Sequence, residues 1–386
     1  MSGSKLVWLP LLGALACVAC GGNVNLGGKP GPSSEPDGND DEPTGPDAPV
    51  GKSVAVFPDP IRVNLMAVAG DYLYVGNDEG LSRCLKRNCI PTLELVPNVA
   101  GSLNSLQVYE DRLAVTHSST DELWFADYSL PLGARENVVI RDLPPLGSAT
   151  PLWHGGFLYW HLNLDSKIYR CALPSCATGP ELVGSYLNDT DMSADGEMLF
   201  WFAYRAIYRS PNRGGGPVVA LLPDATLSEA PPEALVEPLD TPLDMPTALT
   251  TSAGMLYVAL ARAQPNPPTC GESCPHSIMR WPVEGGAGEE LFTSNGAIDR
   301  MYAFGGELIW HDIPSTFRES TLWSCLADNC VSTRRKLGQV SATQTQVVAD
   351  DTSVYWLEAV SDGVAFDGSM RFANGAIHRA PRLSPE

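Results

Sequence analysis

Short apolar phrases recur along the chain from Ser53 to the C-terminus, each one preceded by a tight turn. Turn pairs such as Gly70 with Asp71 come before β-branched and aromatic residues, which is the pattern of a β-hairpin. The seven copies are Leu73–Val75, Leu113–Val115, Leu158–Trp160, Leu199–Trp201, Leu256–Val258, Leu308–Trp310 and Val354–Trp356. Intervals of 40, 45, 41, 57, 52 and 46 residues separate them, which fits a repeated four-stranded unit and is too irregular for a helical solenoid.

A second apolar phrase follows each first one and predicts the next strand of the same unit. These phrases are Leu81–Arg83, Leu123–Phe125, Ile168–Arg170, Ile207–Arg209, Ile278–Arg280, Leu322–Ser324 and Ile377–Arg379. Weaker stretches supply a fourth strand, as at 93–96, 138–140, 182–183 and 218–222. Aligning the copies gives an innermost-strand column of Met66, Leu106, Pro151, Met192, Leu249, Met301 and Val347. Because this column is apolar in every copy, we expect it to form the core between units.

The last unit ends at 381–386, directly after its third strand, and lacks a fourth. The strand-like stretch Ser53–Phe57 stands alone before the first unit. If it pairs with the last unit, two exposed sheet edges disappear. The sequence therefore predicts an all-β fold: a seven-bladed β-propeller of four-stranded antiparallel blades, with the N-terminal strand closing the last blade.

The phrases Leu158–Trp160 and Ile168–Arg170 resemble the YWTD repeat of lipoprotein-receptor propellers, and more closely the propeller-bearing lipoproteins of myxobacterial type. The resemblance extends from Ser53 to the C-terminus. His161 and His311 stand where the repeat has threonine, and the acidic residue that follows is usually missing. The YWTD family is six-bladed, whereas seven copies occur in this chain. The resemblance implies a propeller, and receptor-style ligand binding does not transfer.

The N-terminus predicts a lipoprotein signal peptide over residues 1–20. One lysine, Lys5, precedes the apolar run Leu6–Val18, which is shorter than the ~20 residues of a membrane-spanning helix. The run ends in CVACGG, which resembles a bacterial lipobox, whose cysteine receives a diacylglycerol with acyl chains such as palmitate. We expect lipid attachment at Cys20 because two glycines follow it, with Cys17 as the alternative. The absence of aspartate after Cys20 predicts an outer-membrane location in the cell envelope.

Residues 21–52 are rich in Pro, Gly, Asp and Ser and predict a disordered linker. Such a tether spans roughly 30 Å and can hold a domain, residues 53–386, away from a membrane surface. The acidic run EPDGNDDEPTGPD lacks the ligand spacing and closing glutamate of a calcium-binding EF-hand loop. The whole chain is acidic: 25 Lys and Arg against 45 Asp and Glu give a net charge of -20, which repels nucleic acids.

Eight cysteines after Cys20 fall into four close pairs. The pairs are Cys84 with Cys89, Cys171 with Cys176, Cys270 with Cys274, and Cys325 with Cys330. Three of them follow a third-strand phrase and would clamp the hairpin to the fourth strand. Zinc is the alternative, but the pairs lie in separate units without neighbouring histidines, so we expect disulfides in an exported chain. Each closes a short loop that contributes about 2 kcal/mol.

No catalytic, metal or cofactor site is predicted. The column that opens the inner strands, where propeller enzymes place acids or histidines, reads Asn64, Asn104, Ala149, Thr190, Thr247, Asp299 and Thr345. The adjacent column adds Asp191 and Arg300, and neither column contains histidine, which is a poor basis for acid–base or metal chemistry. We expect the six histidines to have structural roles. Candidate binding residues at the channel mouth are Asn64, Asn104, Asp191, Asp299 and Arg300.

We therefore expect a monomeric binding or scaffold lipoprotein that recognises an envelope protein or a glycan, with a hydrolase or lyase using Asp191, Asp299 and Arg300 as the alternative.

In a propeller, the connections from second to third and from fourth to first strand share one face, called here the upper face. That face carries the long insertions Pro223–Pro246, Ala261–Ser277, His311–Ser320 and Glu358–Ala376. Drift in loop length is the alternative reading, since loops tolerate insertion at little cost; clustering on one face favours a recognition surface.

Overall fold

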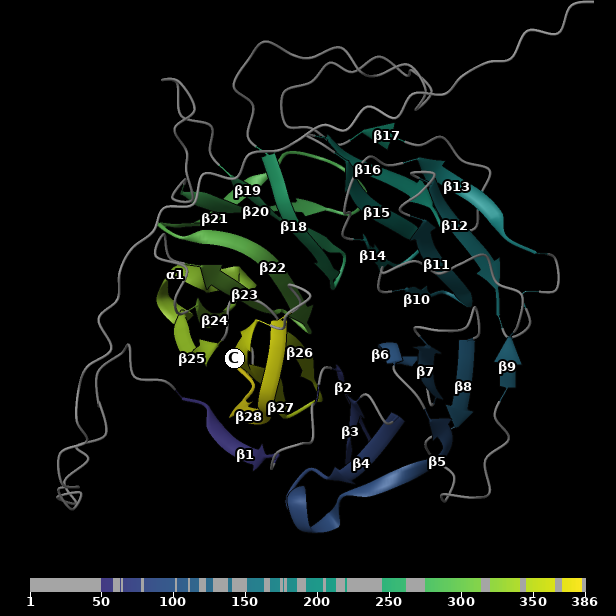
Figure 1. Ribbon diagram of the computed structural model, residues 1–386. Helices are drawn as coiled ribbons and strands as arrows, with labels where there is room; N and C mark the ends of the chain where they lie inside the picture. The colour runs from purple at the N-terminus through teal and green to yellow at the C-terminus, as the bar shows by residue number, and fades with distance from the viewer. Residues whose placement is uncertain are drawn as a thin grey trace, which may run out of the picture. The chain divides into compact units, whose positions relative to one another are not determined.

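The computed structural model describes residues 50–57, 63, 65–77, 80–100, 103–109, 112–117, 123–127, 138–140, 151–162, 167–173, 176, 179–185, 192–203, 206–212, 219–220, 245–261, 275–313, 320–340, 345–364 and 370–383. Within these ranges the chain forms seven four-stranded sheets, in which neighbouring strands run antiparallel (Figure 1). No helix in the described ranges is long and apolar enough to cross a membrane.

Each sheet takes consecutive strands. Sheet 1 contains β2 (Leu65–Ala69), β3 (Tyr72–Asn77), β4 (Gly80–Leu85) and β5 (Glu94–Ala100). Sheet 2 contains β6 (Leu103–Tyr109), β7 (Arg112–His117), β8 (Leu123–Asp127) and β9 (Val138–Ile140). Sheet 3 contains β10 (Leu152–His154), β11 (Phe157–Leu162), β12 (Lys167–Ala172) and β13 (Glu181–Ser185). Sheet 4 contains β14 (Met192–Asp195), β15 (Met198–Ala203), β16 (Ala206–Pro211) and β17 (Val219–Ala220).

The remaining sheets follow the same order. Sheet 5 contains β18 (Met245–Ser252), β19 (Met255–Ala261), β20 (His276–Pro282) and β21 (Glu289–Ser294). Sheet 6 contains β22 (Ala297–Phe304), β23 (Glu307–Ile313), β24 (Ser320–Leu326) and β25 (Arg335–Val340), with the short helix α1 (Cys330–Thr333) before β25. Sheet 7 contains β26 (Thr345–Ala349), β27 (Ser353–Val364), β28 (Met370–Pro381) and β1 (Lys52–Val56). Every first phrase of the sequence lies in a second strand and every second phrase in a third strand.

The N-terminal strand completes the last sheet, as the sequence predicts. Strand β1 pairs antiparallel with β28, from Lys52 opposite Arg379 to Val56 opposite Ala376, and the two lie side by side in Figure 1 (purple and yellow). The Phe57 N–H extends the pairing by donating to the Gly375 carbonyl at 2.9 Å. A strand from one end of the chain therefore closes a sheet built from the other end.

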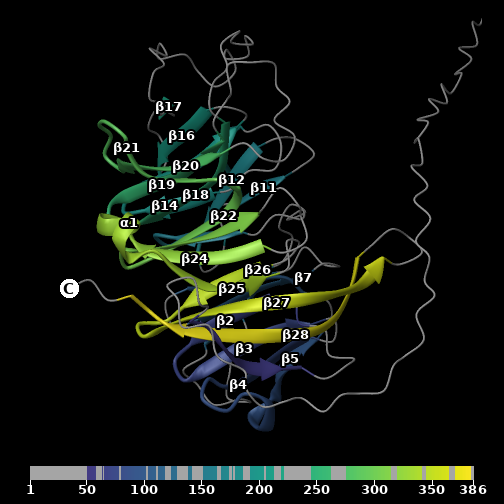
Figure 2. The ribbon, with the colours of Figure 1, turned by 90° about the vertical axis from the view of Figure 1, so that its left-hand side faces the viewer.

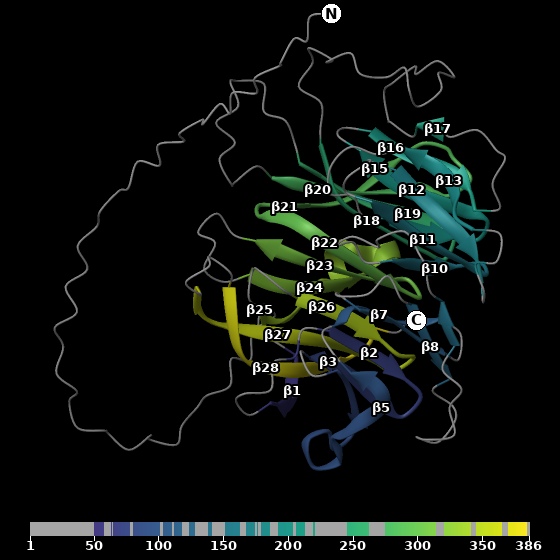
Figure 3. The ribbon, with the colours of Figure 1, turned by 45° about the vertical axis from the view of Figure 1, so that its right-hand side comes forward.

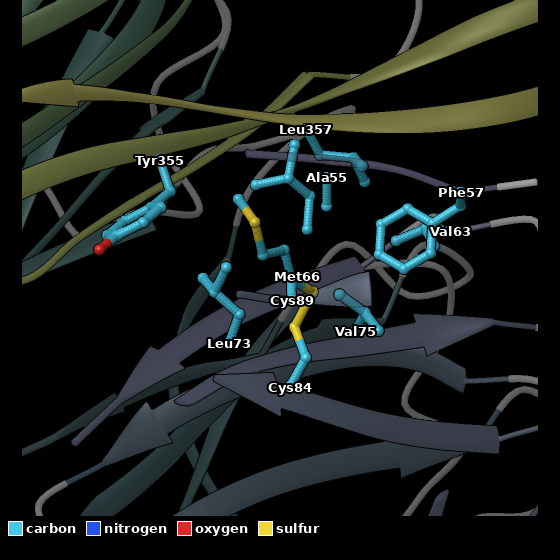
Figure 4. Packing of buried hydrophobic residues seen from close by; sticks show 11 residues of the cluster. Ala55, Phe57, Val63, Met66, Leu73, Val75, Cys84, Cys89, Tyr355 and Leu357 are labelled. Carbon is cyan, nitrogen blue, oxygen red and sulfur yellow. A yellow bond between two sulfur atoms is a disulfide. The ribbon is translucent and has the colours of Figure 1, made fainter. Parts of the chain in front are cut away.

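Seven apolar clusters fill the spaces between consecutive sheets. Six join each sheet to the next one in the chain, and the seventh joins sheet 7 to sheet 1. In that seventh cluster, Ala55, Tyr355 and Leu357 pack on Met66 and the Cys84–Cys89 disulfide (Figure 4). Because each sheet is buried on both faces, its second strand is a continuous apolar run rather than an alternating one.

In sheets 3, 4 and 5, an arginine of the third strand ties the sheet to the next one. The guanidinium of Arg170 donates to the Asn212 carbonyl, that of Arg209 to the Val283 carbonyl at 3.1 Å, and that of Arg280 to the Ala327 carbonyl at 3.5 Å. Each acceptor lies directly after the third strand of the following sheet. These three arginines thus supply hydrogen bonds to carbonyl groups that lose contact with water on burial.

Three predicted disulfides are present. They join Cys84 to Cys89, Cys171 to Cys176 and Cys325 to Cys330, with Cα atoms 4.7, 5.0 and 4.8 Å apart, and each follows a third strand. Cys270 and Cys274 lie outside the described residues, as do Cys17 and Cys20.

One expected insertion is largely strand. Residues 358–376 were predicted as an upper connection, but β27 and β28 each run for 12 residues and pair as far as Val364 opposite Met370. Figure 2 shows this hairpin (yellow) extending beyond the other strands. Two irregularities in register, between Ala359 and Val360 and between Ser361 and Gly363, interrupt the alternation, so the sequence there lacks a strand pattern.

Candidate functional site

Two residues of the predicted column come together where sheets 5 and 6 begin. Thr247, on β18, donates from its hydroxyl to the Ile298 carbonyl on β22 at 2.6 Å. The Ile298 N–H donates to Nδ1 of His276 at 3.0 Å, so this nitrogen carries no proton. Burial lowers the pKa of His276, while the charge of Asp299 raises it in part. A neutral histidine thus holds the start of β22 against β18 and β20.

Asp299 contacts a second histidine, His311, from the end of β23. The pairing of β22 with β23 is irregular between Ile298 and Arg300, so Asp299 has no opposite residue. Its Oδ1 lies 2.7 Å from Nδ1 of His311, whose side chain is 2% exposed against 39% for Asp299. Among the described residues, Nε2 of His311 has no hydrogen-bond partner.

The predicted channel-mouth set is described only in part. Arg300 lies exposed on β22 and Asn104 lies on β6, whereas Asn64 and Asp191 fall outside the described residues. The sequence interpretation overlooked His276 and His311, which join Thr247 and Asp299. His311 directly follows the apolar phrase of its second strand. It pairs with Arg300 of the inner strand, next to Asp299, and this position in the hairpin could have identified it as a site residue.

A cleft of about 400 Å³ lies between sheets 5 and 6, which Figure 3 shows as neighbouring layers. We call it the aromatic cleft; it is lined by Phe292, Thr293, Ser294, Asn295, Gly296, Trp310, Asp312, Trp323 and Arg334. Asp312 lies near the end of a second strand, and Asn295 and Gly296 connect a fourth strand to the next first strand, so this end of the cleft belongs to the upper face. Arg334 comes from the connection between a third and a fourth strand, towards the lower face.

Two aromatic rings of the aromatic cleft stack on the guanidinium of Arg334. The guanidinium carbon of Arg334 lies 4.8 Å from the ring centre of Phe292 and 5.0 Å from that of Trp323. Trp310 packs against Phe292 with ring centres 5.6 Å apart. Both distances from Arg334 are within the range of cation–π attraction.

A carboxylate lies inside the aromatic cleft. Burial raises the pKa of Asp312, although a hydrogen bond from Ser294 and the charges of His311 and Arg334 lower it in part. The Ser294 hydroxyl donates to Oδ2 at 2.5 Å. A Cβ atom at position 296 would lie 1.8 Å from Oδ1, so only glycine leaves room for the carboxylate there.

A second cleft, of about 230 Å³, lies between sheets 7 and 1. We call it the closure cleft; it is lined by Asp71, Leu85, Lys86, Arg87, Asp350, Thr352, Tyr355 and Arg379. Nζ of Lys86 lies 2.5 Å from Oδ2 of Asp350, and the Tyr355 hydroxyl donates to the same oxygen at 3.3 Å. Burial alone would raise the pKa of Asp350, but hydrogen bonds from Lys86 and Thr352 lower it to about 2.

Comparison with known proteins shows the fold. No protein-family model and no curated protein matches the sequence. Among solved structures, the chain is similar to virginiamycin B lyase from Staphylococcus aureus, with TM-score 0.51 and 10% identity over 85% of this chain and 98% of that one. It is also similar to the AfRom2 CNH domain, with TM-score 0.54 and 10% identity over 86% and 100% of the two chains.

The tricorn protease is a further neighbour, with TM-score 0.54 and 12% identity over 84% of this chain and 34% of that one. These neighbours and the repeated four-stranded sheets show a β-propeller fold. At such identities the likeness carries no chemistry. Among the described residues, no group of three or more His, Cys, Asp or Glu side chains could hold a metal ion.

Proposed function

We propose that this chain is an exported lipoprotein whose propeller has seven blades in a closed ring and binds a protein or glycan in the cell envelope. The seven sheets, the cluster that joins sheet 7 to sheet 1 and the pairing of β1 with β28 support the closed ring. Three disulfides support export, because such bonds persist in oxidising compartments.

The aromatic cleft is the observation that carries the binding role. It combines Phe292, Trp310 and Trp323 with a carboxylate and a guanidinium, in a volume of about 400 Å³. Ligand sites combine apolar walls with a few polar groups in this way, at volumes of roughly 300–1,000 Å³. One end of the cleft, at Asn295, Gly296 and Asp312, belongs to the upper face, where the long insertions were predicted. Upper-face recognition of an envelope component follows.

Anchoring is tested by Cys20→Ala, which removes the thiol that would carry the lipid. The variant is expected in the soluble fraction, since the signal sequence supplies no spanning helix. Cys17→Ala is the matched control and should stay in the membrane fraction. Retention of Cys20→Ala together with release of Cys17→Ala would move the anchor to Cys17, and retention of both would exclude lipid anchoring.

Upper-face binding is tested by removing residues 223–244, a deletion that leaves β18 intact. Cross-linking on intact cells should then capture no partner, while the melting temperature stays nearly unchanged. Trp323→Ala should also reduce capture, and Arg87→Ala, an exposed arginine of the closure cleft, should not. Capture that survives both the deletion and Trp323→Ala would show that the working surface lies elsewhere.

A hydrolase or lyase remains the second candidate because of one observation. Asp299 binds Nδ1 of His311 and leaves Nε2 without a partner among the described residues, which is how an acid orients a general base. However, His311 is almost completely buried. Turnover of generic esters that disappears in Asp299→Ala would favour the enzyme, and absence of turnover in the unmodified protein would favour binding alone.

A further inference from the structure

We propose that the aromatic cleft binds the cationic side chain of a protein partner, a guanidinium or ammonium group, and that Arg334 occupies the ring walls until such a group displaces it. This inference rests on the proposed binding function and selects a protein over a glycan. It concerns the residues Phe292, Asp312, Trp323 and Arg334.

The structure already holds a cation in the site. One guanidinium lies between two aromatic rings, 4.8 Å from Phe292 and 5.0 Å from Trp323. The negative faces of aromatic rings attract cations at such distances, and pairs of rings form the cages that recognise ammonium groups. The ring faces that a sugar would stack on are therefore arranged around positive charge.

Arg334 does not satisfy the carboxylate behind it. The hydrogen bond that Asp312 accepts comes from the neutral hydroxyl of Ser294, and among the described residues no cationic nitrogen forms a direct ion pair with it, although the charges of His311 and Arg334 act on it from further away. A half-buried carboxylate without a direct ion pair favours a cation that reaches it. A neutral sugar could not form that ion pair, which is the reason for preferring a cationic ligand.

Arg334 can leave the cleft. It is exposed, lies between the end of α1 and the start of β25, and makes no hydrogen bond or ion pair with other described residues. Ring stacking and the longer-range attraction of Asp312 hold it, and both are weak at an exposed site. A ligand cation that both stacks on the rings and reaches Asp312 therefore competes with it, and the net charge of -20 attracts basic partners.

The test is calorimetric titration of the full chain with Nα-acetyl-arginine methylamide and with its neutral isostere Nα-acetyl-citrulline methylamide. The arginine probe should bind and the citrulline probe should not. Arg334→Ala should tighten binding about 2- to 5-fold by removing the internal competitor. Asp312→Asn should weaken it roughly 10-fold or more, because a charge-assisted hydrogen bond is lost. Arg87→Ala, the matched exposed arginine, should change nothing.

Equal binding of both probes, or an Arg334→Ala variant with unchanged affinity, would overturn the proposal, and so would no binding at all. Competition by N-acetylglucosamine instead would assign the cleft to glycans. Phe292→Leu, which removes an aromatic ring but keeps an apolar side chain, is measured beside Trp323→Ala. Loss of binding in both variants, with unchanged melting temperature in Phe292→Leu, separates loss of the ring contacts from loss of folding. If the arginine probe fails while Trp323→Ala still abolishes partner capture, only this inference fails; if capture is also unaffected, the proposed function fails with it.

Discussion

The closure cleft and the aromatic cleft each lie between two neighbouring sheets, yet their charges are arranged in opposite ways. In the closure cleft, Lys86 and Asp350 form an ion pair at 2.5 Å and a tyrosine hydroxyl adds a hydrogen bond. In the aromatic cleft, Arg334 stacks on rings and Asp312 is held by a serine. The interface between sheets 7 and 1 is therefore fixed by an ion pair. The interface between sheets 5 and 6 holds aromatic rings and a carboxylate that a ligand can contact.

The pKa values express the same contrast. In the closure cleft, hydrogen bonds outweigh burial and the pKa of Asp350 falls to about 2, whereas in the aromatic cleft burial outweighs the hydrogen bond and the pKa of Asp312 rises. A carboxylate with a lowered pKa stabilises the fold, and one with a raised pKa costs stability. Groups that cost stability are the ones expected at binding sites.

The largest expected effect comes from breaking the interface between sheets 7 and 1. Phe57 is fully buried in that cluster, so Phe57→Ala should lower the free energy of unfolding by about 3–5 kcal/mol. The neighbouring Val56 is 59% exposed, and Val56→Ala should change it by less than about 0.5 kcal/mol. Chemical denaturation measures both. Equal effects of the two variants would contradict closure by the N-terminal strand.

The second prediction concerns the lock in the closure cleft. Because the pKa of Asp350 falls from 3.8 to about 2 in the folded protein, its charge contributes about 2 kcal/mol of stability above pH 4. This contribution is lost as the pH falls from about 4 towards 2. Asp350→Asn should therefore cost about 2 kcal/mol at pH 7, with a difference from the unmodified protein that shrinks in acid. Denaturation at several pH values follows it, and a difference independent of pH would refute the ion-pair explanation.

The smallest expected effect has the opposite sign. The pKa of Asp312 is raised, so its charged form destabilises the folded protein above its unfolded pKa. Asp312→Asn should leave stability unchanged or raise it, by less than about 1 kcal/mol, at pH 7, and the gain should vanish as the pH falls. Thermal denaturation of both asparagine variants side by side compares the clefts directly. A loss of stability in Asp312→Asn as large as that in Asp350→Asn would remove the distinction.

The repeat pattern predicted the sheets because burial on both faces forces apolar residues into every second and third strand. It also predicted the pairing of β1, because the last unit lacks a fourth strand and an unpaired sheet edge would otherwise be exposed. The disulfides followed from spacing after the third strand. The strand phrases and the cysteine spacings are local in sequence, whereas the pairing of β1 was inferred from the missing fourth strand of the last unit.

The aromatic cleft could not be predicted in this way. Phe292 comes from a fourth strand, Trp323 from a third and Arg334 from a connection, and only the packing of two sheets brings them together. The contact between Asp299 and His311 depends on an irregularity in β22 that no alternation reveals. Predicting a site between two sheets requires knowing which side chains of each sheet face the other sheet.

Site-specific photo-cross-linking in living cells tests the central claim, that the aromatic cleft and not the closure cleft contacts the partner. A photoreactive amino acid is placed at Asn295, exposed at the aromatic cleft, or at Arg87, exposed at the closure cleft. We predict a discrete adduct from position 295 that disappears when Trp323→Ala is added, and none from position 87. An adduct from position 87 alone would contradict the account.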